Sequence, residues 1–203
     1  MDFMSGELET QNKRTIQAVC DELIEHRRVI EVLNVKQILR ISEVVFECLN
    51  RNGQVLFCGN GGSASQAQHF AAELVCKYKM NRRAFASISL TTDTSIITAQ
   101  ANDTGYDTVF ERQVEALCNK GDVLIALSTS GESRNVIKAA KKAKIIGAKV
   151  IAFVGKNKEN ELSRIADVVL SVESTDTPRI QEAHLTAGHI MCGIVERRLV
   201  SKS

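Results

Sequence analysis

The chain has 203 residues, of which 44% are hydrophobic and 25% are charged, close to the averages for globular domains. This composition argues against a disordered, a collagen-like or a membrane protein, and the length suits one domain with a large core. The formal net charge of +2 comes from 26 basic and 24 acidic residues, so no strong field for binding nucleic acid is indicated. We expect residues 1–203 to form a single domain.

Two features of the sequence bear on its location. The N-terminus has no apolar run after a basic start, and no apolar run approaches the roughly 20 residues needed to span a bilayer. The six cysteines form no CxxC pair and lie mostly among apolar residues, as reduced thiols in a protein core do. We therefore predict a cytoplasmic protein that does not bind membranes.

Residues 1–52 are predicted to form N-terminal helices. Apolar residues recur at helical spacing in two runs, one around Ile16, Val19 and Leu23 and the other from Val35 to Val45. The part through Arg28 is rich in charge, so it either packs on the domain or reaches a neighbouring subunit. The sequence leaves both alternatives open.

Residues 53–200 are predicted to form an α/β core with a last helix. Short apolar runs alternate with helical segments, and the runs expected to be strands are residues 54–58, 84–90, 122–127, 149–154 and 167–172. The continuous apolar run 123–127 is typical of a strand buried on both faces of a parallel sheet. The expected fold is a three-layer α/β/α sandwich with a five-stranded parallel sheet, followed by a helix from Pro178 to about Leu199.

Two polar loops follow buried strands and precede helices, where open parallel sheets bind their ligands. In Gly59-Asn-Gly-Gly-Ser-Ala-Ser65, glycines allow the backbone to approach an anion, and Ser63 is expected to cap the next helix. The second loop, Ser128-Thr-Ser-Gly-Glu-Ser133, offers four hydroxyls, and it can donate several hydrogen bonds to a phosphate. Each loop could be a plain turn, but two in one small sheet favour phosphate binding.

A third polar segment, Asn102-Asp-Thr-Gly105, follows a helix that Thr92-Asp-Thr94 is expected to start. By itself this segment is compatible with an ordinary turn.

Candidate metal ligands lie on two of the predicted helices. His69 and Glu73 are four residues apart and share one helix face, while Gln181, His184 and His189 lie on the last helix. Two imidazoles, a carboxylate and an amide would suit a borderline ion such as zinc. Such spacings also arise by chance, so the residues alone leave a structural role open. We expect His26 and His184 not to be catalytic.

Five motifs, in this order, resemble those of the phosphoheptose isomerases, a family with the sugar-isomerase (SIS) fold. The similarity covers about residues 35–200. The motifs are Cys58-Gly-Asn-Gly-Gly-Ser63, Ala67-Gln-His-Phe-Ala-Ala-Glu73, Leu90-Thr-Thr-Asp-Thr-Ser95, Ser128-Thr-Ser-Gly131 and Thr177-Pro-Arg-Ile-Gln-Glu182, followed by His189.

The resemblance implies an activity and an assembly. The reaction would convert sedoheptulose 7-phosphate into D-glycero-D-manno-heptose 7-phosphate through an enediol or enediolate, a step toward bacterial surface heptose. The enzyme would be a homotetramer with active sites between subunits.

The resemblance also implies roles for particular residues. One Zn²⁺ per subunit would be bound by His69, Glu73, Gln181 and His189, and Glu73 and His189 would be the catalytic acid/base pair. The substrate-binding residues would be Asn60, Gly61, Gly62, Ser63, Glu73, Asn102, Asp103, Ser128, Thr129, Ser130, Ser133 and Gln181.

The chain departs from the family pattern at two places. Lys77 stands where members often have an arginine, which would bind phosphate through two hydrogen bonds rather than as a point charge. A glycine pair is missing near residues 156–159. Both departures bear on substrate affinity and on the heptose pathway served.

Two other functions were weighed against the isomerase. One is a non-catalytic SIS protein that binds the replication initiator DnaA, in which arginine and asparagine would replace Ser130 and His189; both enzyme residues are present here. The other is a SIS isomerase or sensor of another sugar phosphate, such as a hexosamine 6-phosphate, which the His69/Glu73 and Gln181/His189 pairs disfavour.

Overall fold

The computed structural model describes residues 2–157 and 159–201, with side chains described from residue 11 onward. The helices are α1 (Asp2–Glu31), α2 (Val35–Asn50), α3 (Gly62–Val75), α4 (Thr94–Thr104), α5 (Val109–Leu117), α6 (Arg134–Ile146), α7 (Glu161–Ile165) and α8 (Thr177–Val200), with a 3-10 turn at Tyr106–Thr108. The strands are β1 (Val55–Gly59), β2 (Ser87–Ser89), β3 (Val123–Leu127), β4 (Lys149–Val154) and β5 (Val168–Ser171).

The five strands form one parallel sheet in the order β2-β1-β3-β4-β5. The predicted α/β fold with a five-stranded parallel sheet and N-terminal helices is confirmed. Because β2 and β3 lie on opposite sides of β1, the direction of winding reverses between β1 and β3. Open α/β sheets bind ligands at such a reversal, beyond the carboxyl ends of the strands.

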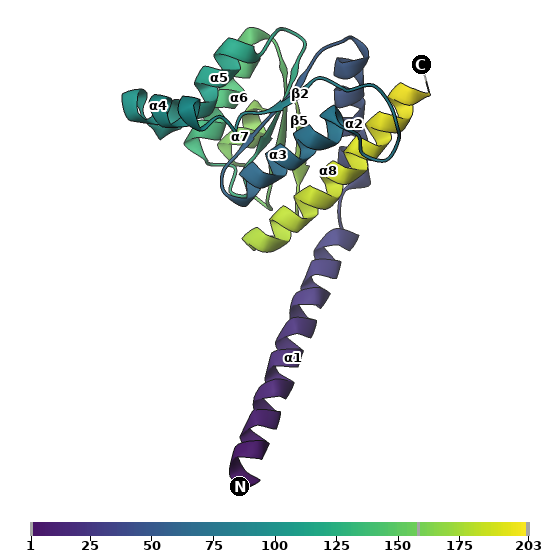
Figure 1. Cartoon of the computed structure of the whole chain (residues 1–203), viewed down its shortest axis with the longest axis vertical. Helices are drawn as coiled ribbons and strands as arrows, with labels where there is room; N and C mark the ends of the chain where they lie inside the picture. The colour runs from purple at the N-terminus through teal and green to yellow at the C-terminus, as the bar shows by residue number, and fades with distance from the viewer. Residues whose placement is uncertain (1, 158, 202–203) are drawn as a thin grey trace.

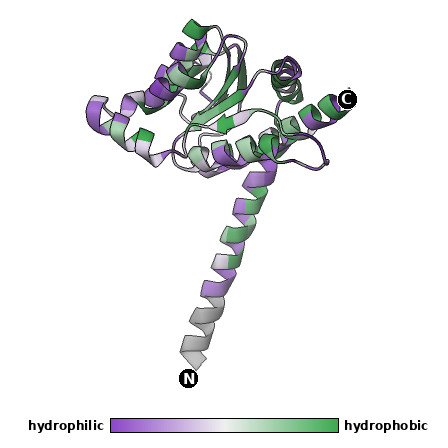
Figure 2. Ribbon diagram, turned by 45° about the horizontal axis from the view of Figure 1, so that its top comes forward, coloured by the Kyte–Doolittle hydropathy of each residue, from purple (hydrophilic) through white to green (hydrophobic). Residues whose placement is uncertain are grey.

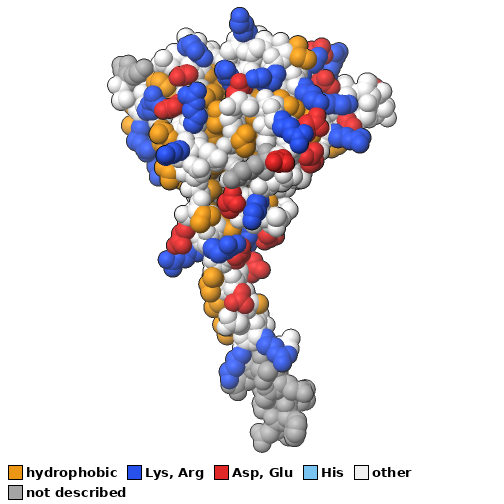
Figure 3. All heavy atoms as spheres, turned by 180° about the vertical axis from the view of Figure 1, so that it is seen from behind, with side chains coloured by type: hydrophobic (Ala, Val, Ile, Leu, Met, Phe, Trp, Pro, Cys, Tyr) orange, Lys and Arg blue, Asp and Glu red, His pale blue; other side chains and the backbone are white. Residues whose placement is uncertain are grey.

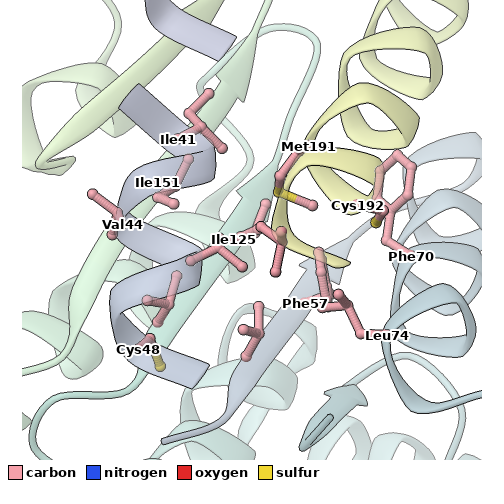
Figure 4. Close-up of a cluster of buried hydrophobic side chains, with 14 of the residues drawn as sticks. Ile41, Val44, Cys48, Phe57, Phe70, Leu74, Ile125, Ile151, Met191 and Cys192 are labelled. Carbon is pink, nitrogen blue, oxygen red and sulfur yellow. The ribbon is translucent and has the colours of Figure 1, made fainter. Parts of the chain in front are cut away.

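Helices cover both faces of the sheet, so that two helical layers and the sheet between them make three layers (Figure 1). On one face α2, α3 and α8 pack against alternate strand residues, including Phe57 of β1, Ile125 of β3 and Ile151 of β4. In Figure 4 Ile125 lies toward Met191 of α8 and Ile151 lies beside Ile41 of α2, while the rings of Phe57 and Phe70 of α3 have centroids 6.0 Å apart. On the other face α5, α6 and α7 cover the intervening strand residues. The strands are therefore buried on both faces, which explains their continuous apolar sequence.

Helix α1 extends away from the body as a stem (Figures 1 and 2). Its C-terminal part contacts α8: Val29 is buried, and Arg179 Nη1 donates a hydrogen bond to the backbone oxygen of Glu22 at 2.7 Å. Farther out, Ile16, Val19, Leu23 and Ile24 are more than half exposed. The chain therefore presents an apolar surface on α1 that its own domain does not cover.

Strand β2 is shorter than the predicted run 84–90. Residues before Ser87 are drawn toward α3 and α8 instead, because Phe85 N–H donates to the backbone oxygen of Leu74 and Arg82 pairs with Glu196. Only residues 87–89 therefore pair with β1.

The surface agrees with the nearly balanced charge of the sequence. On the face seen in Figure 3, acidic and basic side chains are interspersed over the body. None of the described helices is both long and apolar enough to cross a membrane.

Candidate functional site

The two polar loops lie side by side because β1 and β3 are neighbours in the sheet. The side-chain amides of Asn60, in the first loop, and Asn135, just after the second, exchange two hydrogen bonds of 2.9 Å. Tyr106 Oη also donates to Asn60 Oδ1 at 3.1 Å. Asn135 is 2% exposed and did not stand out in the sequence, since an asparagine in a helical segment has no distinguishing pattern.

In the first loop, the expected helix cap is wrong. Gly61, with φ of 53°, is the N-cap of α3, and Ser63 lies buried inside the first turn without a capping hydrogen bond. Glycine takes this positive φ without strain, so no side-chain cap is needed to turn the chain into the helix. Backbone hydrogen bonds close the turn, since the N–H groups of Ser63 and Ala64 donate to the backbone oxygen of Asn60 at 2.9 and 3.3 Å.

The second loop is organised by hydrogen bonds among its own hydroxyls. Ser128 Oγ donates to Ser133 Oγ at 3.0 Å and accepts from the N–H of Gly131 at 3.1 Å. Thr129 and Ser130 open onto a cleft of about 350 Å³ that Glu132, Lys156, Asn157, Ser174, Thr175, Thr177 and Ile180 also line. Lys156 adds a cation that the loop motif itself does not contain.

A compact cluster of ligating side chains forms where α3 and α8 run together. His69 Nε2 lies 2.7 Å from His189 Nε2 and 3.4 Å from Glu73 Oε1. Among the described side chains, the ligating atoms of His69, Glu73 and His189 all fall within 4.8 Å of one another, near enough for one ion. The structure thus brings together three of the four predicted metal ligands.

The side chain of the fourth predicted ligand, Gln181 of α8, packs against the start of α3. A Cβ atom added to Gly62 would come 2.5 Å from Gln181 Oε1, so the amide packs directly on that glycine. Gly62 is seven residues, or about two helical turns, before His69. Gln66 Nε2 donates to the backbone oxygen of Gln181 at 2.6 Å and fixes α8 on α3 there.

A small cavity opens beside the histidine cluster. Ser65, Gln66, His69 and Leu185 line a space of about 290 Å³ between α3 and α8. A sugar-sized ligand placed there would meet the imidazole of His69 and the side chain of Ser65 in the first turn of α3.

The imidazole of His189 is biased toward its neutral form. Partial burial, followed by the adjacent His69, lowers the pKa of His189, while the carboxylate of Glu73 opposes the shift. A neutral ring keeps a nitrogen lone pair with which it can accept a proton or bind a metal ion.

The other two histidines lie outside this cluster. His184 is fully buried, and its Nε2 lies 3.2 Å from the backbone oxygen of Val154. His26 Nδ1 contacts Glu182 Oε2 at 2.7 Å, where α1 meets α8. Both contacts are structural.

Asn102 and Asp103 lie inside the last turn of α4 rather than in a turn after it. Both are exposed, and α4 contributes no buried side chain to its own domain. In Figure 1 α4 projects from the side of the body away from the C-terminal end of α8. Within one chain, these two residues are not brought to the histidine cluster.

Comparisons with known proteins place the chain in a family. Residues 20–155 match the family model described as SIS domain. The phosphoheptose isomerase of Helicobacter pylori strain P12 is 48% identical over 185 residues, which cover 90% of this chain and 96% of that protein. That of Aquifex aeolicus is 46% identical over 188 residues, covering 93% and 98%.

Solved structures agree. Phosphoheptose isomerase GmhA from Neisseria gonorrhoeae matches with a TM-score of 0.83 and 40% identity, over 91% of this chain and 98% of that one. A phosphoheptose isomerase from Francisella tularensis matches with a TM-score of 0.85 and 32% identity, over 92% and 98%. The chain belongs to the phosphoheptose isomerase family of SIS-domain proteins.

This SIS-domain protein is therefore a sugar-phosphate isomerase. Within it, the hydroxyl loops at the ends of β1 and β3 are candidate phosphate contacts, and the His69, Glu73 and His189 cluster is the candidate reactive centre. Lys77 is exposed, and its Nζ donates to Asn81 Oδ1 at 3.1 Å. Asn81 belongs to neither of the two polar loops.

Proposed function

We propose that this isomerase converts sedoheptulose 7-phosphate into D-glycero-D-manno-heptose 7-phosphate through an enediol or enediolate. The observation that carries the proposal is the convergence of His69, Glu73 and His189 within 4.8 Å, in a chain of the phosphoheptose isomerase family. Aldose–ketose isomerisation needs a base that takes a proton from one carbon and an acid that protonates the neighbouring oxygen or carbon. A carboxylate beside an imidazole supplies both groups.

Glu73 is assigned as the base that moves a proton between C1 and C2 of the sugar. Its side chain is 19% exposed and lies 3.4 Å from His69 Nε2, so it is partly shielded from water and still reachable. His189, whose lowered pKa favours the neutral ring, is assigned to exchange a proton with the substrate oxygens. The loops around Asn60, Gly61 and Gly62 and around Ser128, Thr129, Ser130 and Ser133 are assigned to hold the sugar and its phosphate.

Zinc is the cofactor that the donor set favours. Two imidazole nitrogens and a carboxylate oxygen lie within 4.8 Å of one another, and these are ligands that zinc takes in proteins. When bound, zinc would polarise the substrate carbonyl and stabilise the negative charge of the enediolate. We keep Gln181 as the proposed fourth ligand, although its amide packs on Gly62 within one chain.

We extend the proposal to a cytoplasmic homotetramer with active sites between subunits. Two observations support the assembly: the exposed apolar side chains of Ile16, Val19, Leu23 and Ile24 on α1, and the exposed Asn102 and Asp103 on a helix without buried residues. Large apolar patches on a surface mark interfaces. Light scattering after gel filtration gives the mass, and a monomer would contradict the assembly.

The decisive experiment incubates the purified protein with sedoheptulose 7-phosphate after chelation, and again with added Zn²⁺. Formation of heptose 7-phosphate that depends on the metal is the expected result. No conversion under any metal condition would favour the DnaA-binding type of SIS protein. Conversion of a hexosamine 6-phosphate instead would favour a different sugar-phosphate isomerase.

A further inference from the structure

A single buried carboxylate on α8 holds the segment that leaves α3. Glu196 is 1% exposed, and its Oε1 accepts hydrogen bonds from Tyr78 N–H at 2.9 Å and Arg82 Nε at 3.0 Å. Its Oε2 accepts from the backbone N–H groups of Lys79 at 2.8 Å and Met80 at 3.0 Å. Four donors therefore converge on one buried group, which fixes both the height and the rotation of this segment on α8.

Arg82 connects the same carboxylate to the end of α3. Its guanidinium is 3% exposed and donates from Nη2 to the backbone oxygen of Glu73 at 2.8 Å and from Nη1 to that of Leu74 at 3.0 Å. The Arg82–Glu196 ion pair thus joins the helical turn that carries Glu73 to the helix that carries His189. A shift of either helix would stretch several charge-assisted hydrogen bonds at once.

Tyr78, in the segment so held, lies against His189. The two rings are stacked, with centroids 5.7 Å apart and an interplanar angle of 29°, while His69 meets His189 edge-on at 4.9 Å and 76°. Gly193, four residues after His189, makes room for the tyrosine, because a Cβ there would lie 3.1 Å from Tyr78 Cε1. The imidazole of His189 is therefore in contact with rings from two separate segments.

We infer that Arg82, Glu196 and Tyr78 are positioning residues, which set the place of His189 relative to His69 and Glu73 without contacting the substrate. The inference rests on the proposed function, because it takes this cluster as the reactive centre. Reacting groups must be held within about 0.5 Å of their productive geometry, and a misplacement of about 1 Å can lower the rate by about a hundredfold. The buried pair supplies that constraint between two helices, and the Tyr78 ring transmits it to the imidazole.

The first test compares Tyr78→Ala with Tyr78→Phe. The alanine variant loses the ring stacked on His189, so kcat should fall about tenfold or more while KM changes less than about twofold. The phenylalanine variant keeps the ring and should restore most of kcat. Equal kcat in the alanine variant and the wild type, or a rise in KM without a fall in kcat, would overturn the inference.

A second measurement does not depend on turnover. The chain has four histidines, so their imidazole resonances can be resolved and assigned by NMR. In Tyr78→Ala the resonances of His189 and His69 should move because a neighbouring ring current is lost, whereas those of His26 and His184 should stay in place. Unmoved His189 resonances would overturn the inference. Inactivity of the wild type on sedoheptulose 7-phosphate would instead count against the proposed function, so the two failures can be told apart.

The buried pair is tested with Glu196→Gln, which keeps the shape but replaces an acceptor oxygen with an NH₂ group. We expect the apparent Zn²⁺ affinity, measured by competition with a chromophoric chelator, to fall about tenfold or more, with the same histidine resonances displaced. Gly193→Ala, which places a methyl group against Tyr78, should displace them without touching the ion pair. Unchanged resonances and zinc affinity in both folded variants would reduce Arg82 and Glu196 to a structural role.

Discussion

His69 Nε2 and His189 Nε2, separated by 120 positions in the sequence, lie 2.7 Å apart in the fold. At this distance one ring nitrogen donates a hydrogen bond to the other, and a shift of that proton to Nδ1 of the donating ring would leave both Nε2 atoms able to bind a cation. Glu73, 3.4 Å from the same atom of His69, adds a negative charge that attracts the cation. The three side chains together offer the nitrogen and oxygen ligands that a divalent metal ion takes.

The first prediction follows from this pair. His69→Ala removes one nitrogen ligand, so the apparent affinity for Zn²⁺ should fall by more than about tenfold. Competition with a chromophoric chelator measures the affinity. His26→Ala, at a histidine whose contact with Glu182 is structural, is the matched control and should bind Zn²⁺ as the wild type does. Equal affinities in the two variants would contradict the metal site.

The second prediction concerns the proposed base. Glu73→Gln keeps the size of the side chain but removes the group that accepts the proton, so kcat should fall by about 10² to 10⁴. The melting temperature should change little, because among the described residues Glu73 pairs with the partly exposed His69. Steady-state kinetics and thermal unfolding measure the two quantities.

Glu47→Gln on the exposed face of α2 is the control, with the same chemistry away from the site. Global unfolding of Glu73→Gln would mean that the carboxylate is structural, and turnover near the wild-type rate would remove it from the mechanism.

The sequence predicts those parts of the site that depend on local geometry. The i,i+4 spacing of His69 and Glu73 puts them on one face of α3, and parallel strands place the loops after β1 and β3 at one edge. The approach of His189 depends on how α8 packs on α3. The residues alone offered His189 as one of several candidate ligands, and the resemblance to a family chose it over His184.

Other features depend on contacts between distant segments, and the sequence pattern does not contain them. Strand β2 is shorter than its apolar run because Arg82 pairs with Glu196, 114 positions away. Ser63 does not cap α3 because Gly61 makes the turn by its own positive φ. Asn102 and Asp103 extend α4 instead of ending it, since nothing before Gly105 stops the helix.

The third prediction concerns the serine-rich loop. Ser130 is exposed at the cleft of about 350 Å³, so Ser130→Arg should fill the cleft and raise KM by more than about tenfold or eliminate binding. Ser130→Ala, the matched control, removes one hydroxyl and should raise KM only about fivefold, as expected for one hydrogen bond. Steady-state kinetics separates the two variants. Unchanged KM in Ser130→Arg would contradict the assignment of this loop to phosphate.

The fourth prediction uses His184, which is fully buried and whose Nδ1 finds no hydrogen-bond partner among the described residues. Burial lowers the pKa of His184 to about 4, against 6.5 for the free side chain, and the hydrogen bond with Val154 only partly opposes the shift. Below pH 6.5 the unfolded chain therefore binds a proton that the folded chain does not. The free energy of unfolding should fall as the pH drops from about 6.5 to 4, by up to about 3 kcal/mol from this group alone.

His184→Gln removes this titration, so its free energy of unfolding should depend less on pH over the same interval, although its value at pH 7 should be lower because the buried site is disturbed. Urea unfolding at several pH values measures the slope, and His26→Gln, with the same substitution at a half-exposed position, is the control. The pKa of the partly buried His189 is also lowered, so His189 also makes the free energy of unfolding fall at low pH. This contribution is the same in every variant and cancels in the comparison. If the free energy of unfolding depended on pH in the same way in the wild type and in His184→Gln, water or a rearrangement would solvate the His184 ring. The assignment of a buried neutral imidazole would then be wrong.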